Sequence, residues 1–213
     1  YENAEEHILE NILFLTFTNA AVREQMNREV RLHKKGSHAE KSALEVSRNC
    51  MMTFHSFAMR VYGAIIENLE IKEGTQPTRD GIFKVVIELF QSAPPQKCID
   101  MGSKIKSMFG SIRAIYLDEC QDMSKSQYEF IRILQLDVWQ CGVIMVGDPR
   151  QSIYGFQGAY PENFICAQDL ESNEKIVRSE SKKEIIIVFE KNFRSIPEIV
   201  ELCNITSVPL GFC

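Results

Sequence analysis

Short apolar runs recur along the chain, and each is followed by polar residues that open a helical pattern. ILFLTF (12–17) leads into Thr18 and Asn19, which are good helix N-caps, and then into a stretch with helical spacing. CMMTF (50–54) leads into His55 and another helical stretch, FAMRVYGAIIENL. Strands that alternate with helices predict an α/β fold, in which a parallel sheet is flanked by helices.

Two later apolar runs end in acids. IRAIYL (112–117) is followed by Asp118 and Glu119, and GVIMVGD (142–148) closes with its own aspartate. Because ligands of such sheets bind beyond the carboxyl ends of the strands, we expect these polar residues to share one site. The alternative is that strand ends simply need polar turn residues. That alternative explains one or two such positions, but not an Asp-Glu pair after one strand and GDPRQS after the next.

Two other regions complete the predicted organisation. Residues 66–107 contain a helical IFKVVIELF and the breaker SAPPQ, and we interpret them as a small helical insertion in a main domain formed by 1–65 and 108–213. EIIIVFE (184–190) is predicted as another strand, and the following SIPEIVELCN as a helix with a proline at its start.

Composition limits the functional classes. Hydrophobic residues make up 45% and charged residues 25% of the chain, as in ordinary globular proteins, and no apolar stretch approaches the ~20 residues that cross a bilayer. The seven cysteines show no CxxC spacing, which indicates reduced thiols in an intracellular compartment. A net charge of −5 argues against general attraction to nucleic acid. Residues 23–60 nevertheless hold eight Lys/Arg against four Asp/Glu, an excess that by itself indicates a solvated helical face.

The adjacent carboxylates at 118 and 119 require a chemical reason. Two like charges repel, and burying either without a partner is costly. A carboxylate at a strand tip can hold Mg²⁺, and an adjacent glutamate can polarise an attacking water. We therefore predict that Asp118 and Glu119 form a magnesium-binding pair in which Glu119 is also the general base. An apolar run followed by two acids also arises by chance at turns.

A longer segment makes this prediction more specific. VGDPRQSIYGFQGA (146–159) resembles motif III of the UvrD/Rep-like superfamily 1 helicases, which commonly reads GDxxQSIYGFRGA. Four other segments resemble motifs of the same family in the same order. They are motif Ia, LTFTNAAVREQMNREV; the TFHS motif, TFHSFAMRV; motif II, IYLDECQDMSKSQYEFIRIL; and motif IV, KNFRSIPEIVELCN. Mainly residues 62–110 stay unmatched, and the resemblance implies a RecA-like, P-loop NTPase type of domain.

The resemblance implies an ATP and Mg²⁺ site at the strand tips. Its catalytic residues would be the general base, a γ-phosphate sensor and a γ-phosphate-binding arginine, which are Glu119, Gln151 and Arg194. Cofactor contacts would come from Asp118, Gln121, Asp148 and Phe193. Gln121 would couple the nucleotide to the nucleic acid, and Phe193 stands where an aromatic stacks on adenine, keeping the ring without a hydroxyl.

The resemblance also implies a path for single-stranded DNA. Tyr154 and Phe156 lie two apart in IYGF, and aromatic rings stack on bases at ~1–3 kcal/mol each without reading sequence. Further positions that match the DNA path are Phe17, Thr18, Asn19, Thr53 and His55. Taken without the motifs, the residues favour a core role for Phe17 and a helix-cap role for His55.

Three departures from the family bear on activity. The GxxGxGK[ST] phosphate loop and the later motifs with their arginine finger are not among these residues, and Gln157 stands where the family commonly has arginine. We expect a parent ATP-dependent DNA helicase or translocase, completed by a remaining motor domain and located in a nucleus or a bacterial cytoplasm. This chain alone is expected to be inactive. The alternative is a truncated paralogue without catalysis that keeps only nucleic-acid or partner binding.

Overall fold

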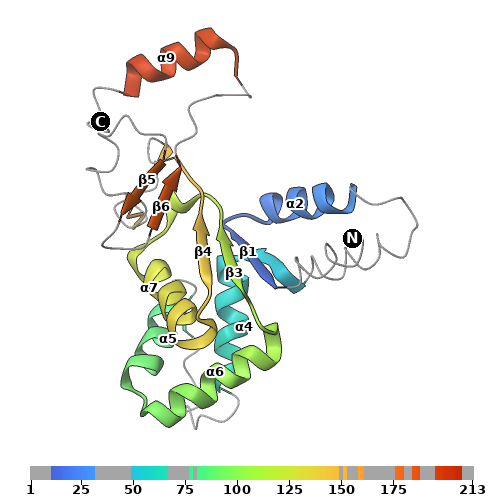
Figure 1. Cartoon of the computed structure of the whole chain (residues 1–213), viewed down its shortest axis with the longest axis vertical. Coiled ribbons are helices and arrows are strands. Elements are labelled where there is room, and N and C mark those ends of the chain that lie inside the picture. The colour runs from blue at the N-terminus through green and yellow to red at the C-terminus, as the bar shows by residue number, and fades with distance from the viewer. Residues whose placement is uncertain are drawn as a thin grey trace.

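A four-stranded parallel sheet lies at the centre of the protein, with strand order β2-β1-β3-β4 (Figure 1). The computed structural model describes residues 11–31, 49–66, 77–78, 81–148, 151–152, 158–160, 176–179, 184–187 and 195–207. The strands are β1 (Ile12–Thr16), β2 (Met51–Thr53), β3 (Ala114–Leu117) and β4 (Gly142–Met145). The predicted α/β fold, a parallel sheet flanked by helices, is confirmed.

The register of the sheet aligns the carboxyl ends of its strands. Thr16 of β1 is paired with Thr53 of β2, and Leu15 of β1 with Leu117 of β3. Leu117 is in turn paired with Met145 of β4. The residues that follow each of the four strands therefore leave the sheet at one edge, which we call the carboxyl edge.

Four helices and a π-helical turn pack with the sheet around the hydrophobic core. They are α4 (Phe54–Ile66), α5 (Gly81–Ser92), α6 (Pro95–Phe109), α7 (Lys125–Ile133) and η2 (Leu134–Trp139). Alternate residues of β1 and β3 are fully buried in this core, as a strand period of two requires. Phe57 and Phe83 both pack edge-on against Phe130, with ring centroids 5.7 and 5.4 Å apart. Burying each such ring contributes about 1.5–3 kcal/mol.

The region interpreted as an insertion supplies two of these helices. Phe83 and Val86 of α5 and Ile105 of α6 are buried in the same core as the strands. Helix α6 continues to Phe109, and the Trp139 indole N–H donates to the Gly110 carbonyl at 3.0 Å. The division into a main domain and an insertion stays an interpretation.

The opposite face of the sheet is more open. Met51, Phe14, Tyr116 and Ile144 form one row across the four strands. The rings of Phe14 and Tyr116 stack with centroids 5.0 Å apart, and Ile144 on β4 is 51% exposed. Helix α2 (Asn19–Arg31) extends from the end of β1 away from α4–α7, and it contains no buried residue (Figure 1).

The carboxyl-terminal part contains a separate pair of strands. β5 (Ile176–Ser179) and β6 (Glu184–Ile187) form a two-stranded antiparallel sheet. The predicted strand in 184–190 therefore exists, but it pairs with β5 and does not extend the parallel sheet. Helix α9 (Pro197–Ser207) begins at a proline, as predicted. Across the described residues, no helix has the length and apolar character needed to span a membrane.

Candidate functional site

The acidic loop, residues 118–122, is held between the ends of β1 and β4. The Asp118 N–H donates to the Leu15 carbonyl at 3.0 Å, and the Cys120 N–H donates to the Val146 carbonyl at 2.9 Å. These bonds continue the hydrogen bonding of the sheet beyond the last residue of β3. The loop, which ends in the short 3₁₀ helix η1 (Cys120–Asp122), therefore has a fixed backbone at the carboxyl edge.

Glu119 occupies a left-handed backbone conformation, with φ 56° and ψ 42°. This conformation costs a residue with a side chain roughly 1–2 kcal/mol, because Cβ approaches the following carbonyl oxygen. Strain of this kind persists only where surrounding contacts enforce it, and it is common at functional sites. The hydrogen bonds of its neighbours, Asp118 and Cys120, supply that enforcement.

Gln121 connects the acidic loop to the segment that follows β4. Its side chain is 98% buried, since its exposed fraction is 2%. The side-chain amide donates to Glu119 Oε2 at 2.7 Å, and the side-chain carbonyl accepts the Asp148 N–H at 3.1 Å. The Gln121 backbone carbonyl also accepts the Ser152 hydroxyl at 3.1 Å. A single buried amide therefore bridges two segments that are far apart in sequence.

Gly147 allows this close approach. A Cβ atom at this position would collide with Oε1 of Gln121 and would lie 3.0 Å from the backbone nitrogen of Cys120. The backbone atom cannot move without disturbing the acidic loop. The glycine of GDPRQS is therefore required by packing at the site.

The predicted γ-phosphate sensor lies at the end of the same network. Gln151 is exposed, and its side-chain amide donates to Asp148 Oδ2 at 3.0 Å. Its backbone N–H donates to the Asp148 carbonyl at 2.9 Å. The structure therefore brings together Glu119, Gln121, Asp148 and Gln151 in one hydrogen-bonded chain. Asp118 adjoins that chain in sequence, and the Glu119 N–H donates to its carboxylate at 3.1 Å.

Burial and like charge make this edge unfavourable for carboxylates. Burial raises the pKa of Asp118, and the charge of Glu119 raises it further. The hydrogen bond from the Glu119 N–H and the charge of Arg28 on α2 oppose that rise. Burial followed by the charge of Glu119 also raises the pKa of Asp122, whose Oδ1 is buried without a hydrogen-bond partner. A cation at this edge would relieve the repulsion.

Cys120 adds no charge of its own to the loop. Burial raises the pKa of its thiol to about 12, so the group is neutral near pH 7. The thiol donates to the Leu117 carbonyl at 3.3 Å. It acts as a packed, uncharged side chain beneath the acids.

The donor set fits a metal ion that arrives with phosphate ligands. In the part of the chain that the structure describes, no three His, Cys, Asp or Glu side chains gather into a metal-binding group. Mg²⁺ commonly takes only one or two protein carboxylates, and substrate phosphates and water supply its other ligands. Asp118 is half-buried at the carboxyl edge and suits that role.

Five of the positions predicted to line the DNA path are described, and they lie at the same edge, at the end of β2 or directly after β1 and β2. Thr18 caps α2 by accepting the Ala21 N–H at 3.1 Å, and the Thr53 hydroxyl accepts the Ser56 N–H at 3.2 Å at the start of α4. Asn19 is exposed. These contacts give both threonines a structural role that a DNA contact would have to share.

Two aromatic positions of that path are partly packed. The Phe17 ring lies 4.9 Å from the Phe54 ring, and the His55 ring meets the Phe83 ring edge-on at 5.3 Å. Both Phe17 and His55 are half-buried. The other predicted site residues, Tyr154, Phe156, Phe193 and Arg194, lie outside the described residues.

Sequence reasoning did not assign two residues of the site. Gly147 packs closely against Gln121, and the Ser152 hydroxyl donates a hydrogen bond to the Gln121 backbone carbonyl. Both stand inside the quoted GDPRQS segment, so a signal was present in the motif. The pattern alone did not reveal that their common partner is a buried glutamine.

A parallel sheet whose carboxyl edge holds an acidic loop bridged to the next strand end defines an α/β protein of the RecA-like class. Residues 85–170 match the family model of the UvrD/REP helicase N-terminal domain. Over these residues the chain is similar to the UvrD/Rep-like helicases.

Curated relatives agree with this assignment. The chain is 28% identical over 151 residues to ATP-dependent DNA helicase PcrA of Leuconostoc citreum, covering 71% of this chain and 17% of that protein. It is 36% identical over 93 residues to ATP-dependent DNA helicase srs2 of Schizosaccharomyces pombe, covering 43% and 9%. It is 34% identical over 95 residues to ATP-dependent DNA helicase Rep of Escherichia coli, covering 44% and 12%. The matched part therefore spans at most 17% of the length of these three relatives.

Proposed function

We propose that the chain is part of the ATP-binding motor domain of a helicase or translocase that moves along single-stranded DNA. The observation that carries the proposal is the hydrogen-bonded chain from Glu119 through Gln121 to Asp148 and Gln151. It joins the two segments that resemble motifs II and III. The relatives named ATP-dependent DNA helicases support the same reaction.

Each residue of the edge has a defined task in this proposal. Asp118 would hold Mg²⁺, which supplies charge neutralisation of the phosphates when bound. Glu119 would accept the proton of the attacking water. The side-chain amide of Gln121 donates a hydrogen bond to the Glu119 carboxylate at 2.7 Å and so fixes its orientation. Gln151 would orient that water beside the γ-phosphate. Arg194 and Phe193, outside the described residues, would bind the γ-phosphate and the adenine ring.

Coupling to the nucleic acid would pass through Gln121. A displacement of the Glu119 carboxylate alters the partner of the Gln121 amide, and the other end of that amide holds the Asp148 backbone. Ser152 is also hydrogen-bonded to Gln121, and in the sequence it is followed closely by Tyr154 and Phe156. These aromatics would stack on bases, with Phe17, Thr18, Asn19, Thr53 and His55 lining the strand.

The complete cleft would need groups from elsewhere in a parent protein. A lysine-bearing phosphate loop and an arginine finger would come from other segments, including the remaining motor domain. An arginine finger supplies about 10³–10⁵ in rate in related phosphoryl transfers. We therefore place ATP hydrolysis in the parent protein, acting inside the cell, and nucleotide-linked DNA contacts in this chain.

DNA-stimulated ATPase activity of the parent protein tests the proposal. Glu119→Gln keeps the side-chain size and removes the base, so kcat should fall about 10²–10⁴-fold with little change in KM for ATP. Glu88→Gln on the exposed side of α5 is the matched control and should leave kcat unchanged. Equal activity of Glu119→Gln and wild type would contradict the assignment. The inactive paralogue would be favoured if the protein hydrolysed no ATP and its affinity for an oligonucleotide did not change when Mg-ATP was added.

A further inference from the structure

A polar row crosses the sheet at the carboxyl edge. Thr16, the last residue of β1, is paired with Thr53 of β2. On its other side Thr16 has Asp118 as its neighbour, because the preceding residues, Leu15 and Leu117, are paired. The hydrogen bond from the Asp118 N–H to the Leu15 carbonyl continues this register beyond β3. Since neighbouring strands lie about 4.8 Å apart, the side chains of Thr16 and Asp118 are adjacent at this edge.

The hydroxyl of Thr16 is a buried polar group without a partner. The exposed fraction of Thr16 is 1%, and among the described residues its Oγ1 atom makes no hydrogen bond. Thr53 differs, since its hydroxyl donates to the Ser56 hydroxyl at 2.9 Å and accepts the Ser56 N–H at 3.2 Å. Burying a hydroxyl without a hydrogen bond is unfavourable, and such a group in a folded protein calls for an explanation.

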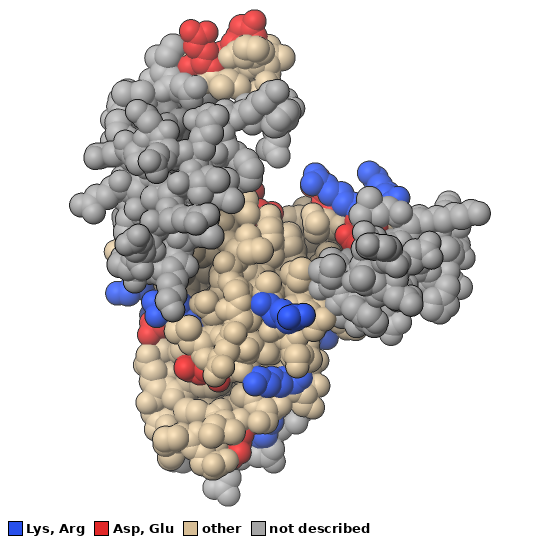
Figure 2. All heavy atoms as spheres, in the orientation of Figure 1, with Lys and Arg blue, Asp and Glu red and all other residues tan. Residues whose placement is uncertain are grey.

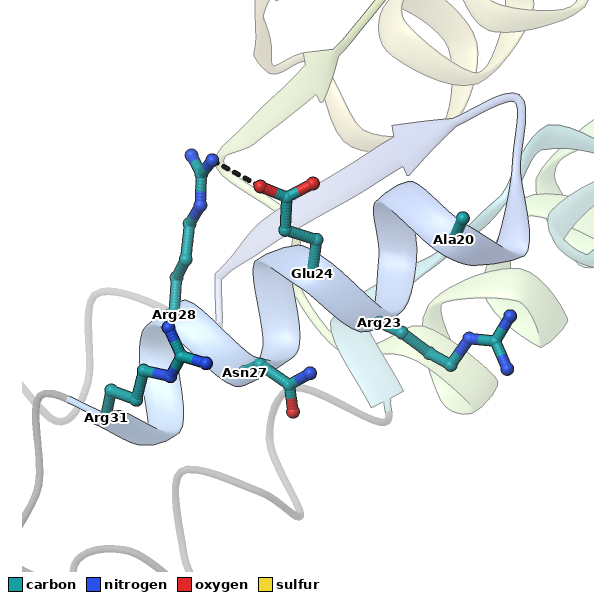
Figure 3. A pocket seen from close by; sticks show the side chains of 6 residues that line it. All are labelled: Ala20, Arg23, Glu24, Asn27, Arg28 and Arg31. Atoms are coloured by element: carbon teal, nitrogen blue, oxygen red, sulfur yellow. Dashed lines mark hydrogen bonds and ion pairs between the residues drawn. The ribbon is translucent and has the colours of Figure 1, made fainter.

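The carboxylate of Asp118 can accept a further donor. In the part of the chain that the structure describes, its hydrogen bond comes from the Glu119 N–H, which donates to Oδ1 at 3.1 Å. An ionised carboxylate accepts several such bonds. Arg28 on α2 opposes the rise that burial causes in the pKa of Asp118, but its guanidinium is ion-paired with Glu24 (Figure 3). Figure 2 shows the Lys and Arg side chains over α2 standing out from the surface.

We propose that Thr16 is a positioning residue for the metal-binding carboxylate, and that its hydroxyl donates to Asp118 when Mg²⁺ and nucleotide are bound. Such a bond would fix the carboxylate with one oxygen toward the metal, as the hydrogen-bond partners of metal ligands commonly do. Rotation about χ1 moves the Thr16 hydroxyl between staggered positions without moving the backbone. The inference rests on the proposed function, since it assumes Mg²⁺ at Asp118.

Metal affinity tests this role separately from catalysis. Mn²⁺ is titrated into the parent protein with a non-hydrolysable ATP analogue, and the free ion is followed by electron paramagnetic resonance. Thr16→Val keeps the shape and removes the hydroxyl, so the dissociation constant of Mn²⁺ should rise about 10-fold. Thr16→Ser retains a hydroxyl and should bind like wild type. The control Ser103→Ala removes an exposed hydroxyl from α6 and should also bind like wild type.

Stability separates this role from a packing role. In thermal unfolding of the full chain without nucleotide, Thr16→Val should melt at the wild-type temperature or above it, because a methyl group replaces an unpaired buried hydroxyl. Thr53→Val should melt lower than wild type, since the Thr53 hydroxyl makes two hydrogen bonds. A lower melting temperature for Thr16→Val would show that its hydroxyl supports the fold, and would overturn the inference.

The metal titration also distinguishes this inference from the proposed function. An unchanged Mn²⁺ affinity in Thr16→Val would overturn the role of Thr16 and leave the function standing. Equal weakening in Thr16→Ser would overturn it as well, because the hydroxyl would then not be the cause. Asp118→Asn tests the function itself and should weaken Mn²⁺ binding in the same assay. If Asp118→Asn bound Mn²⁺ like wild type, the proposed metal site and this inference would both fail.

Discussion

The side-chain amide of Gln121 donates to the carboxylate of Glu119 at 2.7 Å, although Glu119 is exposed and Gln121 is buried. The buried member is thus the fixed partner, and the exposed acid takes its position from it. This relationship explains how the carboxylate proposed as the general base can be held in one orientation at a solvent-facing edge. It also makes the glutamine a target for substitution.

Gln121→Leu should destabilise the fold by about 1–3 kcal/mol, because the Asp148 N–H would lose its buried acceptor. Urea unfolding followed by circular dichroism measures the change. Gln91→Leu is the control, since the Gln91 amide bonds to the Glu129 carboxylate at 2.9 Å in an exposed position. The control should change stability by less than about 0.5 kcal/mol. Equal effects of the two substitutions would contradict the bridging role of Gln121.

Gly147→Ala should destabilise the protein by about 1–3 kcal/mol, because its methyl group would press on Gln121 and on the Cys120 backbone. Gly63→Ala on α4 gives the opposite expectation. A Cβ at Gly63 meets nothing within 4 Å, and alanine favours a helix over glycine by about 0.5–1 kcal/mol. Thermal unfolding of both variants should therefore move in opposite directions. If Gly147→Ala left the melting temperature unchanged, the acidic loop would be able to move far enough to accommodate the methyl group.

The backbone of Glu119 predicts an inverted order of two substitutions. Glu119→Gly and Glu119→Ala both remove the carboxylate that Gln121 binds, so they differ only in backbone preference. At φ 56° glycine avoids the Cβ penalty, and Glu119→Gly should be more stable than Glu119→Ala by roughly 1 kcal/mol. Chemical denaturation midpoints give the comparison. The usual order, with alanine the more stable, would mean that the left-handed conformation is absent.

Much of the fold follows from the sequence because apolar runs are bounded by polar residues. The strand predicted at 12–17 is observed at Ile12–Thr16, and that at 112–117 begins two residues later, at Ala114. The antiparallel pairing of β6 with β5 was not predicted, because the short segment 176–179 was not recognised as a strand. The carboxyl edge was predictable from parallel topology. The left-handed Glu119 and the buried bridge of Gln121 were not, because both depend on contacts with the segment after β4.

Asp118→Asn should stabilise the protein near neutral pH. Burial and Glu119 raise the pKa of Asp118 above its ordinary value of 3.8, so the folded state holds its proton more tightly than the unfolded state. The contribution of Asp118 to the free energy of unfolding therefore falls as the pH rises from about 3.8 through the raised pKa. Above the raised pKa, the destabilisation by the ionised carboxylate is complete and constant. The melting temperature of Asp118→Asn minus that of wild type should grow from near zero at low pH to a positive value. A difference that shrinks as pH rises would contradict this assignment.

The capped helices at the carboxyl edge have one further electrostatic effect. α2, α4 and α7 all begin there, immediately after β1, after β2 and after the acidic loop. The positive ends of their peptide dipoles therefore face the same region of solvent, each equivalent to about half an elementary charge. This fixed field opposes the negative potential of the three acids and does not change with pH. A polyanion approaching the edge meets an attraction built from the backbone, which no side-chain substitution removes.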